Sequence, residues 1–337
     1  MAYFNSLVNK ANGGVFIIAE ACDNHMGSLE IAKALARGAK KAGCDAVKFQ
    51  HHLPSEEMLR NAKMSDNFDE HLFDFLVKNA LTINEHKLLK KFCDEIGIMY
   101  LCTPFSFLAA KEISKLVPFF KIGSGEFQDL WFIDKLKKLN KPLLLSTGMC
   151  SWDEITEAKN ILKDVDYALM NCLSEYPVKM EDLNLGVVKK MVEEFPDIII
   201  GHSDHSQTNF TSVIAVSNGA KIIEKHISLS NLIFGPDKDV SISIEQMQEL
   251  VFECKSIHKV SKDKKILNKL EKDVRNWAYR SVISDQDIEK GQVITEDMIC
   301  SKRPSGGIPS RDYKKVIGLK AKKRIKKNNF INWEDIE

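Results

Sequence analysis

Eight short apolar runs recur along the first three-quarters of this chain, and each one ends in polar residues. The runs are rich in Val, Ile, Leu and Phe without strict alternation, which is typical of parallel strands covered on both faces. They occupy residues 16–21, 45–50, 99–105, 119–126, 142–148, 167–172, 198–204 and 221–229. Eight strands separated by helix-length segments close a parallel (β/α)8 barrel, so the pattern predicts an α/β fold of the TIM-barrel type.

Helix signals lie between these runs. Ser28 is the expected N-cap of a helix over residues 29–43, and a later helix is expected to end at Gly97. The segment 151–163 opens with Ser-Trp-Asp-Glu, which indicates a capping box. The longest connection, residues 51–82, follows the second strand, and long loops at this end of a barrel usually belong to the active site.

The pattern changes after residue 258. Residues 262–272 are heavily charged, with the helical spacing of Ile266, Leu267 and Leu270, and the rest of the chain has short strands and turns. We therefore expect a barrel domain over residues 1–260, a connector helix over 261–277 and a small β-rich domain over 278–337. A domain of about 60 residues is marginal alone, so we expect it to dock on a barrel, either its own or a partner's.

Net charge, apolar runs and cysteine spacing argue against several classes of protein. The net charge of +1 gives no field that favours nucleic acid or an anionic membrane, and the basic run 320–327 is interpreted as a solvated face. No apolar run approaches the roughly 20 residues that span a bilayer, and residues 1–14 lack the apolar core of a secretory signal. The eight cysteines include no Cys-x-x-Cys pair, which argues against structural zinc and fits a reducing compartment. We expect a cytoplasmic protein with neither nucleic acid nor membrane as a partner, and we interpret Cys102, Cys150 and Cys172 as inert buried thiols.

Two histidines follow the last two predicted strands, His205 after the seventh and His226 at the end of the eighth. Neighbouring strands lie about 4.8 Å apart, so two imidazoles at the same end can reach one ion. Two protein nitrogens leave positions open for water and substrate, which suits an exchangeable Mn²⁺ or Mg²⁺. A single histidine is more simply a hydrogen-bonded core residue, but the pair, with acids beside it, favours a metal site.

Lysines and hydroxyls form a second group at strand ends: Lys48, Lys121, Ser124 and Ser146. Such side chains hold phosphate and carboxylate groups by charge-assisted hydrogen bonds, so their convergence predicts an anionic substrate. The glycines on either side of Ser124 would let a ligand approach the backbone closely.

Three acids, Glu20, Glu126 and Glu224, lie on the first, fourth and eighth strands. A carboxylate among apolar residues is costly unless it is paired. Glu20 is either a general acid or base, or the structural partner of a lysine across the barrel, and the residues alone leave both open.

The strand-end motifs together resemble those of the bacterial sialic acid synthase family, the N-acetylneuraminate synthases. The match runs in order through Ala19-Glu20, Asn24-His25-x-Gly27, Lys48-Phe49-Gln50, Thr103-Pro104-Phe105, Lys121-Ile122-Gly123-Ser124-Gly125-Glu126, Ser146-Thr147-Gly148-Met149, Glu175-Tyr176-Pro177, Ser203-Asp204-His205, Glu224-Lys225-His226 and Gly235-Pro236-Asp237. In the tail, Arg303-Pro304 and Gly306-Gly307-Ile308 resemble the antifreeze-like (SAF) domain of that family. The resemblance covers essentially the whole chain.

The resemblance implies an enzyme that condenses phosphoenolpyruvate with an N-acylated hexosamine to give a nine-carbon 2-keto sugar acid and phosphate. It assigns His205 and His226 to Mn²⁺ or Mg²⁺, and Glu20 and Glu224 to proton and water handling. It assigns to phosphoenolpyruvate Lys48, Thr103, Lys121, Ser124, Ser146, Ser174 and Ser203. It assigns to the sugar Gln50, Asn67, Glu126, Tyr176 and Asp237, with Arg303 supplied by the partner chain of a domain-swapped homodimer.

Two departures from the family pattern concern the substrates. Ser174 stands where some members have asparagine, and Leu-Ile-Phe at 232–234 replaces a basic, polar pair near the sugar. Retained motifs favour a neuraminate- or legionaminate-type synthase over a pseudaminate-type one, but the sugar stays open. Residues 12–14 and the pair His51-His52 have no role in this interpretation.

Three rival interpretations use the same barrel. A Schiff-base aldolase would use Lys121 or Lys225 as an amine nucleophile, but that chemistry has no need of paired histidines. A synthase acting on a phosphorylated sugar to give a seven- or eight-carbon keto acid would need a further basic cluster. A barrel that only binds carbohydrate would have no need to fill every catalytic-type position.

Overall fold

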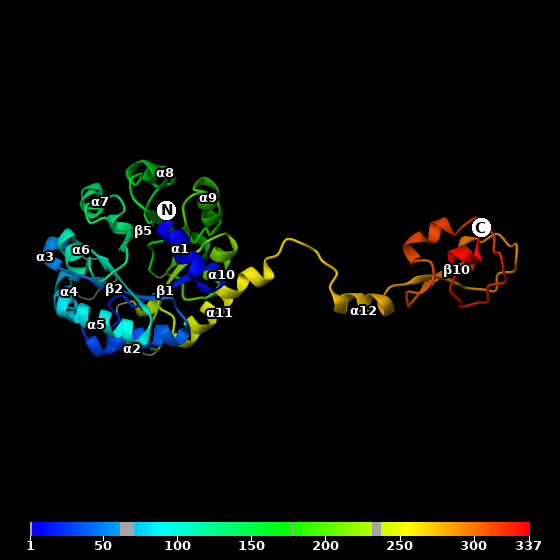
Figure 1. The fold of residues 1–337 in the computed structure, drawn as a ribbon, viewed down its shortest axis with the longest axis horizontal. Helices are drawn as coiled ribbons and strands as arrows, with labels where there is room; N and C mark the ends of the chain where they lie inside the picture. The colour runs from blue at the N-terminus through cyan, green and yellow to red at the C-terminus, as the bar shows by residue number, and fades with distance from the viewer. Residues whose placement is uncertain (1, 61–70, 177, 231–236) are drawn as a thin grey trace. The chain divides into compact units, whose positions relative to one another are not determined.

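The computed structural model describes residues 2–60, 71–176, 178–230 and 237–337. The chain divides into two compact units, Met1–Lys262 and Asp263–Glu337, and each is described separately below (Figure 1). In the described parts of the chain, no helix combines the length and apolar character that a bilayer-crossing segment requires.

The first unit is a barrel of eight parallel strands. The strands are β1 (Phe16–Glu20), β2 (Ala46–His51), β3 (Met99–Pro104), β4 (Phe120–Ile122), β5 (Leu143–Ser146), β6 (Tyr167–Cys172), β7 (Ile200–Asp204) and β8 (Ile222–His226). Their order is β3-β2-β1-β8-β7-β6-β5-β4, and the two end strands, β3 and β4, contact each other without a ladder between their described residues. The predicted TIM-barrel fold is therefore confirmed, with one seam that is not hydrogen-bonded.

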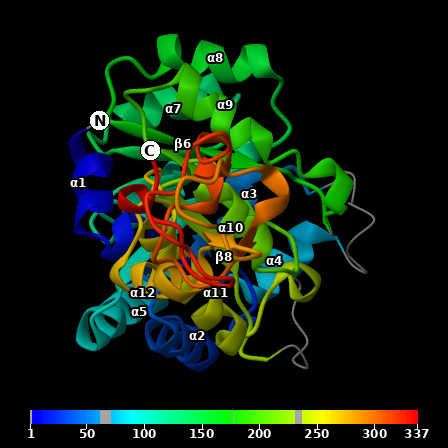
Figure 2. The ribbon, with the colours of Figure 1, turned by 90° about the vertical axis from the view of Figure 1, so that its right-hand side faces the viewer.

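Helices surround the strands, as the spacing of the apolar runs predicts (Figure 1). They are α2 (Leu29–Ala42), α3 (Pro54–Glu57), α4 (Leu72–Asn79), α5 (Ile83–Ile96), α6 (Phe107–Ile113), α7 (Leu130–Lys137), α8 (Trp152–Ile161), α9 (Gly186–Glu194), α10 (Phe210–Ser217) and α11 (Ile244–Val260). Ser28 caps α2, Ser151 forms a capping box on α8, and Gly97 ends α5 in the left-handed conformation, as predicted. Figure 2 shows α2 and α5 side by side on one flank of the barrel.

The N-terminal end of the barrel is filled by apolar side chains. Along β1, Phe16 and Ile18 belong to a cluster inside the barrel, whereas Ile17 and Ala19 belong to the layer between strands and helices. Helix α1 (Ala2–Lys10) closes this end, and its Phe4 is part of the same interior cluster. The same alternation turns the next residues along the strands toward the interior at the open, C-terminal end, and these residues are polar.

Residues Asn12–Gly14 form η1, between α1 and β1. A Cβ at Gly13 would lie 2.3 Å from the carbonyl oxygen of Lys255 in α11. The glycine therefore lets the N-terminal segment pack closely against that helix, which is a structural role.

The second unit is small and β-rich. It contains α12 (Lys269–Ala278) and the antiparallel pair β9 (Ser281–Ser284) and β10 (Ile299–Lys302). Its own apolar core includes Val282, Ile294 and Ile331. The helix begins later than the spacing from Ile266 predicts, because Asn268 caps it in a box with Glu271.

Candidate active site

A cavity of about 780 Å³ opens at the C-terminal ends of the barrel strands. Seven of the eight strands contribute at least one polar side chain to its lining, and β6 contributes the thiol of Cys172. Among the residues predicted as site residues, the lining holds Glu20, Lys48, Gln50, Thr103, Lys121, Ser124, Glu126, Ser146, Ser174, Tyr176, Ser203, His205, Glu224, His226 and Asp237. Asn67 lies outside the described residues, and Arg303 lies in the second unit.

Two lysines and two glutamates form a buried charge cluster on the floor of this cavity. Lys48 Nζ lies 2.8 Å from Glu20 Oε2 and 3.6 Å from Glu224 Oε2, and Lys121 Nζ lies 3.9 Å from Glu224 Oε1. Lys48 also donates to the Thr103 hydroxyl at 2.9 Å. Glu20 is thus paired with a lysine, which is one of the two alternatives left open by the sequence, and it also lines the cavity, while its role as a general acid or base stays a prediction.

The two glutamates differ in proton affinity. Burial raises the pKa of Glu20 to about 7, against the opposing effect of Lys48 and with a smaller contribution from the neighbouring Glu224 charge. Burial acts on Glu224 in the same direction, but Lys121 and Lys48, with a hydrogen bond from Ser203, hold its pKa below the usual value. One carboxyl is therefore suited to carry a proton near neutral pH and the other to stay ionised.

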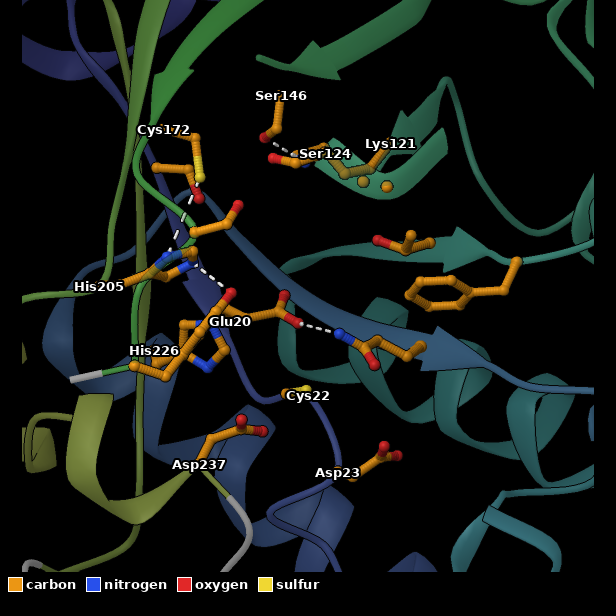
Figure 3. Close-up of a pocket in the computed structure, with 18 of the residues that line it drawn as sticks. Glu20, Cys22, Asp23, Lys121, Ser124, Ser146, Cys172, His205, His226 and Asp237 are labelled. Carbon is orange, nitrogen blue, oxygen red and sulfur yellow. Dashed lines mark hydrogen bonds between the residues drawn. The ribbon is translucent and has the colours of Figure 1, made fainter. Parts of the chain in front are cut away.

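Hydroxyl groups gather beside Lys121. Its Nζ donates to Ser146 Oγ at 2.7 Å (Figure 3). The Gly148 N–H donates to Ser124 Oγ at 3.0 Å. A Cβ at Gly148 would lie 2.3 Å from Ser174 Oγ and 2.6 Å from Ser124 Oγ. The missing side chain at Gly148 therefore leaves room for two hydroxyls from different loops to converge next to a buried ammonium group, which suits an anion.

The two predicted metal-ligating histidines come together. The ring centroids of His205 and His226 are 5.3 Å apart. His205 Nδ1 donates to the Leu173 carbonyl at 2.8 Å, so its Nε2 is left to accept from the Tyr176 hydroxyl at 3.2 Å. His226 Nδ1 is buried without a hydrogen-bond partner in the described part of the chain, and burial, with the nearby His205 and Lys48 charges, holds its pKa well below the usual value. Burial lowers the pKa of His205, but its contacts with Cys172 and the Leu173 carbonyl raise it above the usual value. A neutral imidazole with an unused nitrogen is the form that binds a metal, so His226 fits a divalent cation, with the His205 ring beside it.

Residues just beyond strand β2 form a wall of the cavity that sequence analysis missed. The His52 ring stacks on Phe105 at 4.4 Å between centroids, and its nitrogens contact the Glu57 carboxylate at 3.0 Å and Gln50 Oε1 at 2.9 Å. His51 faces the other way, toward Glu112 at 2.7 Å. Strand alternation could have assigned the two histidines to opposite faces, but the contacts with Phe105 depend on a neighbouring loop.

Two cysteines also line the cavity, although neither was assigned to the site from the sequence. Cys172, interpreted above as an inert buried thiol, has its sulfur 3.9 Å from His205 Nδ1. Cys22 follows β1 by two residues and lies near Asp237 and His226 (Figure 3). The sign that could have found Cys22 is its position just past a strand end, where barrel enzymes place functional side chains.

Comparison with known proteins places the chain. Residues 35–266 match the NeuB family, and residues 279–337 match the SAF domain. The chain is 33% identical to N,N'-diacetyllegionaminic acid synthase of Campylobacter jejuni, over 94% of this chain and 98% of that protein, and 32% identical to pseudaminic acid synthase of the same organism, over 96% and 97%. The crystal structure of N-acetylneuraminic acid (sialic acid) synthetase from Leptospira borgpetersenii matches with a TM-score of 0.69 and 28% identity, over 77% of this chain and 90% of that one. The chain therefore belongs to the NeuB family, as an enzyme of the sugar-acid synthase type that carries a SAF domain.

Proposed function

We propose that this enzyme condenses phosphoenolpyruvate with an N-acyl hexosamine to give a nine-carbon 2-keto sugar acid and phosphate. The sugar is N-acetylmannosamine or a 2,4-diacetamido-trideoxy relative, which makes the product neuraminate- or legionaminate-like. One observation carries the proposal: a buried pair of lysines with converging hydroxyls lies in the same cavity as two imidazoles whose ring centroids are 5.3 Å apart. The names of the relatives are consistent with this proposal. Because the chain is 33% and 32% identical to synthases of two different sugar acids, sequence identity does not indicate which sugar is used.

Phosphoenolpyruvate suits the lysine side of the cavity because it carries a phosphate and a carboxylate. With Glu20 protonated, the cluster of Lys48, Lys121, Glu20 and Glu224 has one net positive charge. The hydroxyls of Thr103, Ser124, Ser146, Ser174 and Ser203 add uncharged donors around it. Charge-assisted hydrogen bonds of this kind are about twice as strong as neutral ones, so they hold the donor substrate in place.

The sugar suits the part of the cavity that is lined by Gln50, Glu126, Tyr176 and Asp237. Glu126 Oε2 is buried and has no hydrogen-bond partner in the described residues, so it can accept from a sugar hydroxyl or amide N–H. A divalent cation held by His205 and His226 would supply Lewis-acid polarisation of the open-chain aldehyde.

The two glutamates divide the proton chemistry. When C3 of phosphoenolpyruvate attacks the aldehyde carbon, the aldehyde oxygen needs a proton, and protonated Glu20 can donate it. Water then adds to the cationic C2, and ionised Glu224 can accept the proton that this water loses. The hydrated centre expels phosphate with C–O cleavage and becomes the 2-keto group.

We also propose a domain-swapped homodimer, built from a barrel over residues 1–260, a connector over 261–277 and a SAF domain over 278–337, in which Arg303 contacts the acyl group of the sugar bound by the partner's barrel. Helix α12 has no buried residue, and Leu270, Val274 and Trp277 form an exposed apolar stripe at helical spacing. Such a stripe gains stability by packing against another surface.

All eight cysteines are free thiols, which suits the cytoplasm.

Of the two lysines that a Schiff-base aldolase could use as its nucleophile, only one lines the cavity. Lys225 is fully buried, contacts Asp204 Oδ2 at 3.1 Å and is not among the residues that line the cavity. Lys121 does line it, so borohydride trapping with a keto substrate is the relevant comparison.

The test uses purified protein, phosphoenolpyruvate and Mn²⁺ with either N-acetylmannosamine or its 2,4-diacetamido-trideoxy counterpart. We expect sugar-dependent phosphate release with one of them, matched by formation of a 2-keto acid. Phosphate release that no N-acyl hexosamine stimulates, or a borohydride-trapped adduct on Lys121, contradicts the proposal.

A further inference from the structure

Among the described residues, one group of three potential metal ligands comes together: Cys22, His226 and Asp237. The Cys22 sulfur, a ring nitrogen of His226 and a carboxylate oxygen of Asp237 all lie within 4.8 Å of one another. Metal–ligand bonds of about 2.0–2.3 Å need the three atoms to close by only about 1 Å. The residues come from the end of β1, the end of β8 and the loop before η4 (Lys238–Val240), and Figure 3 shows them on one side of the cavity.

The Cys22 thiol is hydrogen-bonded to the Asp237 carboxylate, which is a contact between two groups that both bind metals in their deprotonated forms. A divalent ion would displace the thiol proton, as metals do when they bind thiols. His226 adds a neutral imidazole, and its side chain is only 6% exposed.

Hydrogen bonds made by the Asn24 and Ser241 side chains hold these groups in position. The Asn24 side chain donates to the Ile227 carbonyl at 2.9 Å and to Ser241 Oγ at 3.0 Å, and its oxygen accepts from the Asp237 N–H at 3.3 Å. Ser241 Oγ in turn donates to the Asp237 carbonyl at 2.7 Å. The turn that carries Cys22 is therefore tied to the loop that carries Asp237.

The conformation of Cys22 gives a second, independent sign. Its φ is +43°, in the left-handed region that favours glycine. Non-glycine residues in this region are uncommon, and functional sites are among the places where they gather.

Cys172, the other cysteine in the cavity, is less suited to the same role. Its sulfur lies 3.9 Å from His205 Nδ1, but that nitrogen already donates to the Leu173 carbonyl. A metal between Cys172 and His205 would have to break this hydrogen bond first.

We propose that Cys22, His226 and Asp237 hold the divalent cation of this enzyme, with Cys22 bound as a thiolate. The inference rests on the proposed function for the role of the ion and changes its ligand set: Asp237 binds the ion rather than the sugar, and His205, whose ring centroid lies 5.3 Å from that of His226, serves as a further ligand. Three protein ligands leave a position open for water or substrate. Because thiolates are soft ligands, the site prefers Zn²⁺ or Co²⁺ over Mg²⁺.

The test adds Co²⁺ alone to the full-length protein after chelation, and uses Cys22→Gly, Cys22→Ser and Cys172→Ser variants. Cys22→Gly removes the sulfur and relaxes the left-handed backbone, so a loss of binding is not a loss of fold. We expect a thiolate-to-cobalt charge-transfer band in the near-ultraviolet for the unmodified protein and for Cys172→Ser, and no band for either Cys22 variant. Equilibrium dialysis should show Co²⁺ binding weakened at least about tenfold by Cys22→Gly, since even residues outside the ligand shell change metal affinity by about 10–100-fold, while Mg²⁺ binding changes little.

A band that is absent from the unmodified protein, or that survives Cys22→Gly and disappears in Cys172→Ser, overturns the assignment. Phosphate release measured on the same samples separates this inference from the proposed function. A cobalt–thiolate band in a protein that does not condense the substrates refutes the function and supports the ligand set. Condensation by a protein without the band refutes the ligand set and supports the function.

Discussion

Adding one methyl group at Gly148 should weaken the binding of phosphoenolpyruvate without touching any charged residue. A Cβ at this position would lie 2.3 Å from Ser174 Oγ, 2.6 Å from Ser124 Oγ and 3.1 Å from Ser124 Cβ. Atoms cannot approach this closely, so in Gly148→Ala both hydroxyls must turn out of the converging arrangement. The φ of Gly148 is outside the left-handed region, so the effect is one of space rather than of backbone strain.

The magnitude follows from the hydrogen bonds that are lost. A hydrogen bond to a charged group contributes about 1.5–3 kcal/mol. Loss of one such bond to the phosphate raises the KM for phosphoenolpyruvate by roughly tenfold to a hundredfold, since each 1.4 kcal/mol is a factor of about ten. The KM for the sugar should change much less, because the atoms that a Cβ at Gly148 would displace belong to Ser124 and Ser174, which are assigned to phosphoenolpyruvate.

Gly125→Ala is a matched control. Gly125 follows Ser124 and lines the same cavity, but a Cβ there meets no atom within 4 Å. Steady-state kinetics with each substrate varied in turn, and a thermal unfolding curve for each variant, form the assay. If Gly148→Ala and Gly125→Ala give the same KM for phosphoenolpyruvate, the two serines do not bind that substrate.

Three further predictions test other parts of the site. Because the pKa of Glu20 is raised to about 7, its acid form is lost as the pH rises through that value, so kcat should fall there; Glu20→Gln should lose most activity and flatten that limb of the pH–rate profile. His205→Ala should abolish metal-dependent turnover while circular dichroism shows an intact fold, and full activity after chelation would remove the role of the metal. Arg303→Ala should raise the KM for the sugar far more than that for phosphoenolpyruvate, whereas equal increases would argue against the swapped-domain contact.

The barrel could be predicted from the sequence because its strands are nearly continuous apolar runs that end in polar residues. In β1, the change from Ile18 to Glu20 marks both the interior face of the strand and the point where the cavity begins. The pairing of His205 with His226 follows from the same rule, since adjacent parallel strands bring their C-terminal ends together. Strand-end residues were therefore accessible to sequence reasoning.

Contacts between loops were not accessible in this way. The stacking of His52 on Phe105 joins the loops after β2 and β3, and the convergence of Ser124 and Ser174 on Gly148 joins three loops. Their relative placement depends on the path of each loop, which no periodic pattern records. Helix α1 was missed for another reason: Phe4 and Val8 give it only two buried positions, too few for a clear helical stripe.

This division between strands and loops follows the two proposed substrates only in part, since Gln50 of the sugar set lies on β2, and Ser124 and Ser174 of the phosphoenolpyruvate set lie outside the strands. The groups suited to phosphoenolpyruvate include Lys48, Lys121 and Ser146, all on strands that the barrel holds rigidly. The groups on the sugar side include Tyr176 and Asp237, which lie on loops, next to the loop residue His52. Strand residues cannot change position without disturbing the barrel, whereas loops vary freely. The relatives matched here are named for different sugar acids. On the proposed function, exchanging the loops that carry His52, Tyr176 and Asp237 should therefore change the sugar that is accepted more than it changes the KM for phosphoenolpyruvate.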